Sequence, residues 1–365
     1  MRALTFDMTK FAAAGMVAGM LLGAGPAAAS IINSGIFAPA ITAGAPPDSP
    51  GARVDPNIPA SPYSGVVSIN IRYEGQSFIC SGALVGKRSV ISAGHCIDTD
   101  GNGTPINLNT PGADVRVVFN SNGNVNALMT AVGVSINPQY NGFGNCPPGV
   151  NAFCVNDDLA VITLGEDAPA SAKVYKVAVN PLNAGSLITM AGYGTSGTGV
   201  DGFTVPPSFT VKRSGQNYVD LFDQDDEQGF NGANEVYYAD FDGGGQDTFC
   251  DLFGVCTPVL PNNRESGIGG GDSGGPSFVN LYGELMLVAN NTFTGRFDGQ
   301  VPGTFGTYFG GIIMASYADY LYEATDGDIT FVPEPGNVAL FGLAVALLLC
   351  AQRRRINYTA DKTND

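Results

Sequence analysis

The chain has 365 residues, of which 44% are hydrophobic and 14% charged, and its 50 glycines and 23 prolines indicate frequent turns. Its formal net charge of -16 at pH 7 would repel a polyanion over most of the surface, so the composition argues against nucleic acid as a partner. A loop-rich β protein is therefore expected.

The N-terminus has the pattern of a secretory signal peptide. Arg2 and Lys10 precede an apolar stretch over residues 11–25, and three alanines stand directly before Ser30. A basic start, a short apolar run and small residues at its end suit signal peptidase, so residues 1–29 are predicted to be removed on export. The apolar run is shorter than the span of about 20 residues that a permanent anchor requires.

The next segment, residues 30 to about 62, is rich in proline, alanine and glycine without a sustained period, which is typical of a propeptide or an extended lead-in. From Tyr63 onward, β-rich runs recur between turn signals, as in barrels or a sandwich. A single helix is predicted at residues 315–323, where aromatic and apolar residues recur at helical spacing. The predicted strands cover residues 65–73, 77–85, 89–93, 115–119, 159–164, 186–191, 284–289 and 306–314.

The C-terminal region has three parts. A linker at residues 326–337 contains Pro333-Glu334-Pro335, and it is followed by an apolar segment at 338–352 and a tail at 353–365 that begins with three arginines. This order resembles the PEP-CTERM sorting signal of Gram-negative bacteria, which implies processing by an exosortase-type enzyme and a place outside the cell or on its outer surface. The alternative is an ordinary membrane anchor. In both cases the arginines stay cytoplasmic and the preceding domain lies outside.

Cysteine usage agrees with export. Six of the seven cysteines form three pairs of sequence neighbours, while Cys350 lies in the apolar segment. An oxidising compartment lets such cysteines pair, and of the 15 pairings that six cysteines allow, the local ones close the shortest loops. Zinc binding is disfavoured because the chain has one histidine and no C-x-x-C motif. The favoured disulfides are Cys80 with Cys96, Cys146 with Cys154, and Cys250 with Cys256.

Three segments carry residue types of nucleophilic catalysis: residues 91–96 read ISAGHC, 158–161 read DLAV and 271–276 read GDSGGP. A serine hydroxyl becomes a good nucleophile when an imidazole takes its proton, and a buried carboxylate fixes the tautomer of that imidazole. We therefore interpret Ser273 as the nucleophile, His95 as the general base and Asp158 as the residue that orients the base.

These motifs, in the order His, Asp, Ser, resemble the chymotrypsin-like (trypsin-type) serine peptidases. The resemblance extends to Gly192-Tyr193-Gly194 and to residues 287–295. It implies an all-β domain over residues 54–325, built of two antiparallel six-stranded β-barrels at about 54–178 and 179–325, with a short C-terminal helix. It also implies hydrolysis of protein or peptide substrates through an acyl-enzyme, with no cofactor required.

The same resemblance assigns supporting roles around the nucleophile. It places the oxyanion hole at the backbone N–H groups of Gly271 and Ser273, because flanking glycines let the chain turn tightly. It also identifies the Cys80–Cys96 pair with the disulfide of the family's histidine loop. Asp157 adjoins Asp158 and could replace it in the triad, but the leucine that follows Asp158 matches the family pattern.

The family resemblance places three positions at the primary specificity pocket. Gly267, six residues before Ser273, would lie at the base of the pocket, where an aspartate would favour Arg or Lys. A glycine there supplies no buried partner for a basic side chain. Gly306 would leave the pocket wall open and Thr294 would narrow it. Cleavage after small or medium apolar residues is the resulting prediction.

The family resemblance further predicts a zymogen, in which residues 30–53 are the propeptide. Cleavage between Arg53 and Val54 would free an amino group that inserts and pairs with Asp272, and the spacing to Cys80 favours this position. Two observations weaken this assignment. The glycines that usually follow the new terminus are missing after Val54, and Arg53 would equally suit a solvated leader.

Two acidic regions bear on metal binding. Asp98, Asp100 and Asn102 alternate ahead of a glycine, as in an EF-hand loop, and would make a calcium site. Asn109 stands where that motif has its bidentate glutamate, so an exposed turn is the alternative. Residues 220–251 contain many more carboxylates, which we interpret as a solvated insertion rather than a calcium-ordered loop.

Taken together, the motifs predict an exported serine endopeptidase. The alternative from another class is a catalytically idle surface or matrix binding protein that keeps the same fold. The presence of all three triad residues and both oxyanion positions favours the enzyme.

Overall fold

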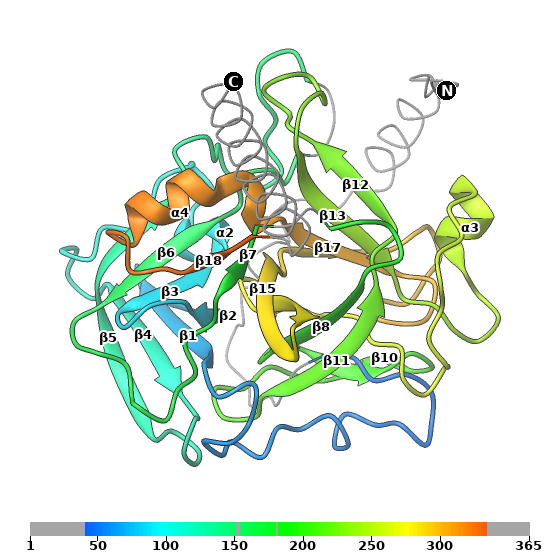
Figure 1. Ribbon diagram of the computed structural model, residues 1–365, viewed down its shortest axis with the longest axis horizontal. Helices are drawn as coiled ribbons and strands as arrows, with labels where there is room; N and C mark the ends of the chain where they lie inside the picture. Colours follow the sequence, from blue (N-terminus) through cyan, green and yellow to red (C-terminus); the bar gives the residue numbers. More distant parts are fainter. Residues whose placement is uncertain (1–40, 151–153, 180–181, 334–365) are drawn as a thin grey trace, which may run out of the picture.

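The computed structural model describes residues 41–150, 154–179 and 182–333. The predicted signal peptide, the apolar segment and the basic tail lie outside the described residues. The described part is mostly β, with two halves side by side (Figure 1). No helix in this part of the chain is long and apolar enough to cross a membrane.

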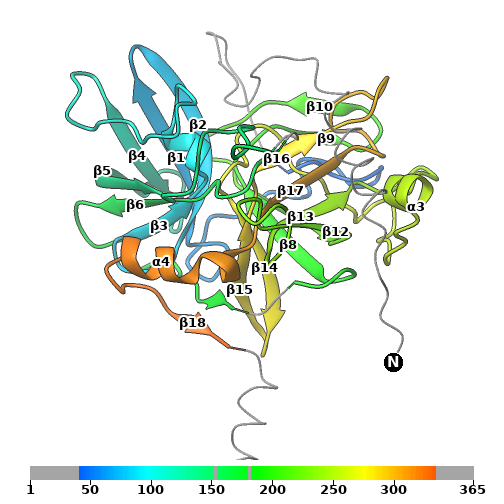
Figure 2. The ribbon, with the colours of Figure 1, turned by 90° about the horizontal axis from the view of Figure 1, so that it is seen from above.

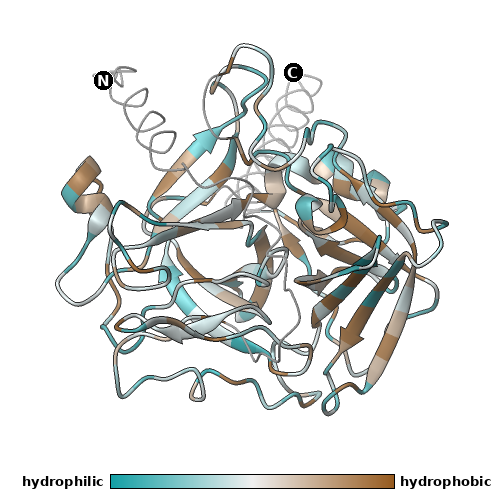
Figure 3. Cartoon of the chain, turned by 180° about the vertical axis from the view of Figure 1, so that it is seen from behind, coloured by the Kyte–Doolittle hydropathy of each residue, from teal (hydrophilic) through white to brown (hydrophobic). Residues whose placement is uncertain are grey.

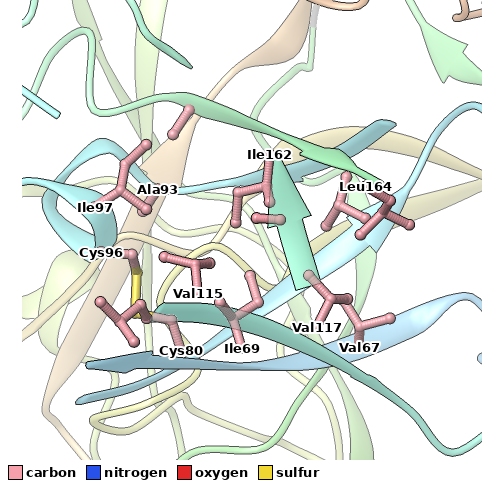
Figure 4. Close-up of a cluster of buried hydrophobic side chains, with 14 of the residues drawn as sticks. Val67, Ile69, Cys80, Ala93, Cys96, Ile97, Val115, Val117, Ile162 and Leu164 are labelled. Carbon is pink, nitrogen blue, oxygen red and sulfur yellow. A yellow bond between two sulfur atoms is a disulfide. The ribbon is translucent and has the colours of Figure 1, made fainter. Parts of the chain in front are cut away.

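The first half is a closed barrel of six antiparallel strands in the order β1-β2-β3-β6-β5-β4. Alternate residues of β1, Val67, Ile69 and Ile71, are buried inside it, as the two-residue period of a strand requires. Figure 4 shows Val67 and Ile69 among the side chains that fill the barrel. The strands are β1 (Val66–Tyr73), β2 (Gln76–Leu84), β3 (Ser89–Ser92), β4 (Asp114–Phe119), β5 (Ala127–Ile136) and β6 (Ala160–Leu164).

The second half consists of several sheets. A six-stranded sheet has the order β11-β8-β14-β15-β7-β18, a four-stranded sheet has the order β12-β13-β17-β16, and β9 pairs with β10. A bridge between Ala289 and Ile313 joins the two larger sheets. The strands are β7 (Val177–Ala178), β8 (Leu187–Gly192), β9 (Ser196–Thr198), β10 (Gly202–Val205), β11 (Arg213–Tyr218), β12 (Leu221–Gln224), β13 (Asn234–Asp240), β14 (Pro276–Leu281), β15 (Glu284–Asn290), β16 (Phe293–Gly295), β17 (Tyr308–Ile312) and β18 (Phe331–Val332).

The predicted second barrel therefore differs in detail from the structure. Its strands do not form one closed six-stranded ladder, and the short β7 pairs in parallel with both β15 and β18. The all-β class itself and the short C-terminal helix are as expected. The helical segments are α2 (Gly94–Ile97), α3 (Thr248–Phe253), the 3₁₀ helix η1 (Met314–Tyr317) and α4 (Ala318–Ala324).

The two halves share a hydrophobic core. Val66, Ile91 and Val161 of the first half pack with Ala191 and Phe278 of the second in one buried cluster. The α4 helix returns from the second half to the first, where the Tyr320 hydroxyl donates to the Ser135 carbonyl at 3.0 Å (Figure 2). In Figure 3, brown hydrophobic segments lie on strands of the first half and on the projecting helix α3. The halves are thus held as one body.

Residues 41–65 run along the second half before they reach the first barrel (Figure 1). Thr42 bridges to Gly267, and Val54 bridges to Arg213 at the start of β11. The buried Lys212 ammonium lies 3.2 Å from the Asp55 carboxylate. Although we expected regular structure from Tyr63, residues 41–53 already pack against the domain.

Candidate active site

His95 and Asp158 meet where two paired strands end. Ser92, the last residue of β3, pairs with Ala160, the first residue of β6, so the residues beyond these ends are neighbours. The His95 Nδ1 atom lies 2.7 Å from Asp158 Oδ2, and the His95 backbone N–H donates to Asp158 Oδ1 at 2.7 Å. Asp158 is fully buried. This double contact fixes the imidazole and leaves Nε2 as the ring nitrogen that can accept a proton.

Of the two adjacent aspartates, the structure brings Asp158 to His95. Asp157 has a φ of 62°, which turns its side chain elsewhere, and its Oδ1 accepts a hydrogen bond from Asn137 Nδ2 at 3.0 Å. The Asn290 amide donates to the backbone carbonyl of Asp158 at 3.3 Å. Asn290 was missed in the sequence because an asparagine just beyond the end of a predicted strand has no distinguishing pattern.

The loop that carries the predicted nucleophile, Ser273, lies beside helix α2 because β2 contacts both. The backbone N–H of Ser81 donates to the carbonyl of Ser273 at 2.8 Å, while the preceding Cys80 forms a disulfide with Cys96. A Cβ added at Gly274 would lie 2.6 Å from the backbone nitrogen of Ala93. Glycine is required at this position because it lets the loop approach the start of α2 so closely.

Asp272 holds the conformation of the loop that is predicted to form the oxyanion hole, which we call the oxyanion loop. Its buried carboxylate accepts hydrogen bonds from the backbone N–H groups of Gly194 at 2.8 Å and Gly269 at 2.9 Å. Gly271, between Gly269 and the nucleophile, has a φ of 100°, a region that favours glycine. Burial raises the pKa of Asp272 to about 6, although these hydrogen bonds oppose the shift.

The predicted activation residues are not brought together. Val54 is 40% exposed, and Arg53 forms an ion pair with Asp48 at 2.5 Å. The backbone N–H that faces Asp272 belongs instead to Ile41, at 3.4 Å from Asp272 Oδ2. The Ile41 side chain is fully buried, and its φ of 41° is unusual for a β-branched residue. The sequence signal that was overlooked is Ile41-Thr42-Ala43-Gly44, an apolar residue closely followed by a glycine.

The expected specificity residues lie on different segments. Gly267 is buried, and a Cβ added there would lie 3.3 Å from the ring of Phe241. Gly306 is also buried, with its carbonyl accepting from Thr248 Oγ1 at 3.0 Å, while Thr294 is exposed. Phe241 packs against Phe305 with ring centroids 4.8 Å apart. This aromatic pair was not anticipated, because single phenylalanines in loops give no periodic signal.

The three predicted local disulfides are confirmed. They join Cys80 to Cys96, Cys146 to Cys154, and Cys250 to Cys256. The first of them is drawn in Figure 4, at the edge of the barrel core. Although Cys80, His95 and Cys96 lie close enough together to share a metal ion, the two thiols are already used in the disulfide.

The Asp98 loop is closed by its own backbone. Asp98 Oδ1 accepts from the Asn102 N–H at 3.1 Å and Asp98 Oδ2 from the Gly103 N–H at 2.9 Å. The Asn102 amide donates to Asp100 at 2.8 Å. These contacts are those of an Asx-type turn, the alternative expected for this loop.

The carboxylates of residues 220–251 are largely buried, so the interpretation of this stretch as a solvated insertion is wrong. They contribute to two acidic groups that also include residues outside the stretch. The first, which we call the lower acidic group, comprises Asp220, Asp240, Asp242, Asp247 and Glu265. The second, which we call the hairpin acidic group, comprises Asp157, Asp225, Asp226, Glu227 and Glu235.

Comparison with protein families finds one matching model, described as Trypsin, over residues 54–227. A search of curated proteins finds no match. Similar solved structures include a thermostable serine protease AL20 from an extremophilic microorganism and HL collagenase, each with 16% identity, a TM-score of 0.44 and 72% of this chain covered. These likenesses cover 97% and 94% of the two other chains, and with such TM-scores they carry no weight for function. The family match and the mostly β architecture support a trypsin-type, chymotrypsin-like domain, a class that needs no cofactor.

Proposed function

On the premise of a trypsin-family domain, we propose that this chain is an exported serine endopeptidase that hydrolyses peptide bonds through an acyl-enzyme. The observation that carries the proposal is the pair of 2.7 Å contacts from Asp158 to the ring and the backbone of His95. A histidine held in this way at a buried carboxylate has one tautomer, with the proton on Nδ1 and a free lone pair on Nε2.

The mechanism follows from this arrangement. His95 Nε2 takes the proton of the Ser273 hydroxyl as its oxygen attacks the scissile carbonyl carbon, and Asp158 stabilises the imidazolium that forms. The oxyanion of the tetrahedral intermediate accepts hydrogen bonds from the N–H groups of Gly271 and Ser273. Collapse expels the amine, which receives the proton from His95, and leaves an ester on Ser273. In the second stage, His95 takes a proton from a water molecule as its oxygen attacks the ester carbon. The Ser273 oxygen then leaves with the proton from His95, and the carboxylic acid product is released.

The activating cleavage is better placed before Ile41 than before Val54. In the single chain, the Ile41 backbone nitrogen already lies 3.4 Å from the Asp272 carboxylate, and the side chain is buried. Cleavage between Ala40 and Ile41 would turn this amide into an ammonium, a stronger partner for a buried carboxylate. It would also release a β-branched residue from a left-handed backbone conformation.

The substrate preference that we propose remains small or medium apolar residues. Gly267 offers no charge at the base of the pocket, and the neighbouring Phe241 presents an apolar ring. Disulfides and the family match favour an extracellular protein. Sorting through the PEP-CTERM-like tail belongs to the same proposal.

The alternative is that the chain is a catalytically idle binding protein. An assay of peptide hydrolysis distinguishes this alternative from the proposed endopeptidase. The purified chain is expected to cleave an unstructured protein such as casein, and Ser273→Ala is expected to lose turnover while keeping the same far-UV circular dichroism. Equal cleavage by Ser273→Ala and the parent, or the absence of any cleavage by correctly processed protein, would favour the alternative.

A further inference from the structure

The lower acidic group gathers carboxylates from four segments of the second half. Asp240 ends β13, Asp242 follows it, Asp247 caps the start of α3, and Glu265 lies two residues before Gly267. Ligand atoms of Asp240, Asp242 and Asp247 all lie within 4.8 Å of one another. Asp220, in the turn before β12, completes the group and accepts hydrogen bonds from the Asp240 N–H at 3.0 Å and from Thr257.

Three of these side chains each use one carboxylate oxygen to accept a hydrogen bond from a backbone N–H. Asp240 uses Oδ2 to accept from the Phe249 N–H at 2.7 Å, and Asp247 uses Oδ1 to accept from the Cys250 N–H at 3.0 Å. Glu265 uses Oε2 to accept from the Leu260 N–H at 2.9 Å. These contacts hold the three carboxylates in fixed orientations. The Asp240 carboxyl group also lies within hydrogen-bond reach of the carboxyl groups of Asp220 and Asp242.

Two carboxylate oxygens of the lower acidic group are buried without any hydrogen-bond partner. They are Oδ1 of Asp242 and Oε1 of Glu265, in residues that are 4% and 0% exposed. None of the ion pairs found among the described residues involves a member of the lower acidic group. The positive charge of Arg53 acts on Glu265, but the Arg53 guanidinium forms its ion pair with Asp48. Buried carboxylates with so little countercharge are strongly unfavourable.

We propose that Asp240, Asp242 and Asp247 bind one calcium ion, and that the buried charge of the neighbouring Glu265 strengthens this binding. The donors are all oxygens, which suits a hard cation, and they come from loops that can supply the flexible coordination of calcium. Magnesium is the weaker candidate because it keeps several waters and demands near-octahedral geometry, whereas Asp240, Asp242 and Glu265 are almost fully buried.

The cation would tie the insertion that contains α3 to the chain that leads to the nucleophile. The segment from β13 to Glu265 carries the Cys250–Cys256 disulfide, and its backbone is anchored at three points to the acidic side chains. Glu265 connects directly to Gly267 and then to the oxyanion loop. Calcium is therefore expected to stabilise the second half without taking part in the chemistry.

The test is calcium binding to chelator-treated protein in the Ser273→Ala background, which prevents self-digestion. Isothermal titration with calcium chloride is expected to show one high-affinity ion for this parent. Calcium in 100-fold excess over Kd is expected to raise Tm by roughly 5 °C or more. Asp242→Asn and Glu265→Gln remove charge with little change of shape, and each is expected to weaken calcium binding and to lose most of the calcium-induced Tm rise.

A matched control is Asp226→Asn in the hairpin acidic group, which is also buried and also has an unpartnered Oδ1. This variant is expected to bind calcium at the lower acidic group like the parent. In excess chelator, Asp242→Asn and Glu265→Gln are expected to unfold at least as late as the parent, because each removes a buried uncompensated charge. The proposal is overturned if the parent shows no calcium response, if both variants bind like the parent, or if both fail to fold in chelator.

Discussion

At the residue scale, the chemistry that we propose depends on how Asp158 is held. Its two oxygens are used on the ring and the backbone of His95, and its carbonyl accepts from the Asn290 amide. The three proposed triad residues could be selected from the sequence because each stands in a short motif with a chemical reason for its composition. Asn290 and Ile41 could not be selected from the sequence, because their roles depend on contacts with distant residues, Asp158 and Asp272.

The orienting role of Asp158 is tested by Asp158→Asn. An asparagine keeps the shape but favours the wrong imidazole tautomer, so kcat is expected to fall by about 10⁴-fold with a much smaller change in KM. Steady-state kinetics on a peptide amide measure the effect. Asp157→Asn is the matched control and is expected to stay within a few-fold of the parent, and a reversal of these two results would exchange the roles of the aspartates.

At the element scale, the first barrel was easier to predict than the second half. Strand β1 alternates buried apolar residues with a polar face, whereas β11 (Arg213–Tyr218) contains no valine or isoleucine. The buried Asn217 of β11 is accommodated by donating to the Asp240 carbonyl at 2.8 Å, a long-range contact that leaves no periodic pattern. Strand β5 was also missed. Leu128 and Val132 are apolar residues on its exposed face, so the strand lacks the alternation of apolar and polar residues that identifies a half-buried strand.

The hairpin acidic group predicts an unusual pH dependence of stability. Burial and neighbouring carboxylates raise the pKa of Asp157 to about 8, and those of Asp226 and Glu235 to about 7. Glu227 and the Tyr317 hydroxyl face the same group. Because these pKa values exceed those of the unfolded chain, about 4, the folded state holds protons that the unfolded state has lost. The contribution to stability is therefore greatest near pH 4 and decreases as pH rises to about 8.

Thermal unfolding in excess chelator at pH 5, 6, 7 and 8 measures this dependence. Glu235→Gln removes one of the titrating groups while its amide oxygen can still accept from Asn156, so its Tm is expected to fall less between pH 5 and pH 8. A parent Tm that rises over this range, or an identical slope in Glu235→Gln, would contradict the assignment.

At the scale of the whole molecule, the N-terminal segment links the two halves to the oxyanion loop. Residues 41–65 run along the second half, begin beside Asp272 and end at the first barrel (Figure 1). Sequence reasoning took residues 30–53 for a removable leader because proline-rich segments without a period are commonly extended. The burial of Ile41 depends on a pocket formed by distant residues, which no local pattern reveals.

The activation proposal is tested by the N-terminus of the active enzyme. Edman sequencing is expected to read Ile-Thr-Ala-Gly, and Asp272→Asn is expected to lower kcat/KM at least 100-fold because the new ammonium loses its buried partner. A fully active enzyme that starts at Ser30 would reject insertion of a new terminus. A start at Val54 would restore the cleavage site first predicted from the sequence.

The central claim, that Ser273 is a nucleophile activated by His95, is tested most directly by labelling with a fluorophosphonate probe and mapping the modified peptide by mass spectrometry. The account predicts one label per chain, on Ser273, and its loss in His95→Ala even though that variant keeps the serine. A folded, correctly processed protein that stays unlabelled, or that is labelled equally in His95→Ala, would contradict it.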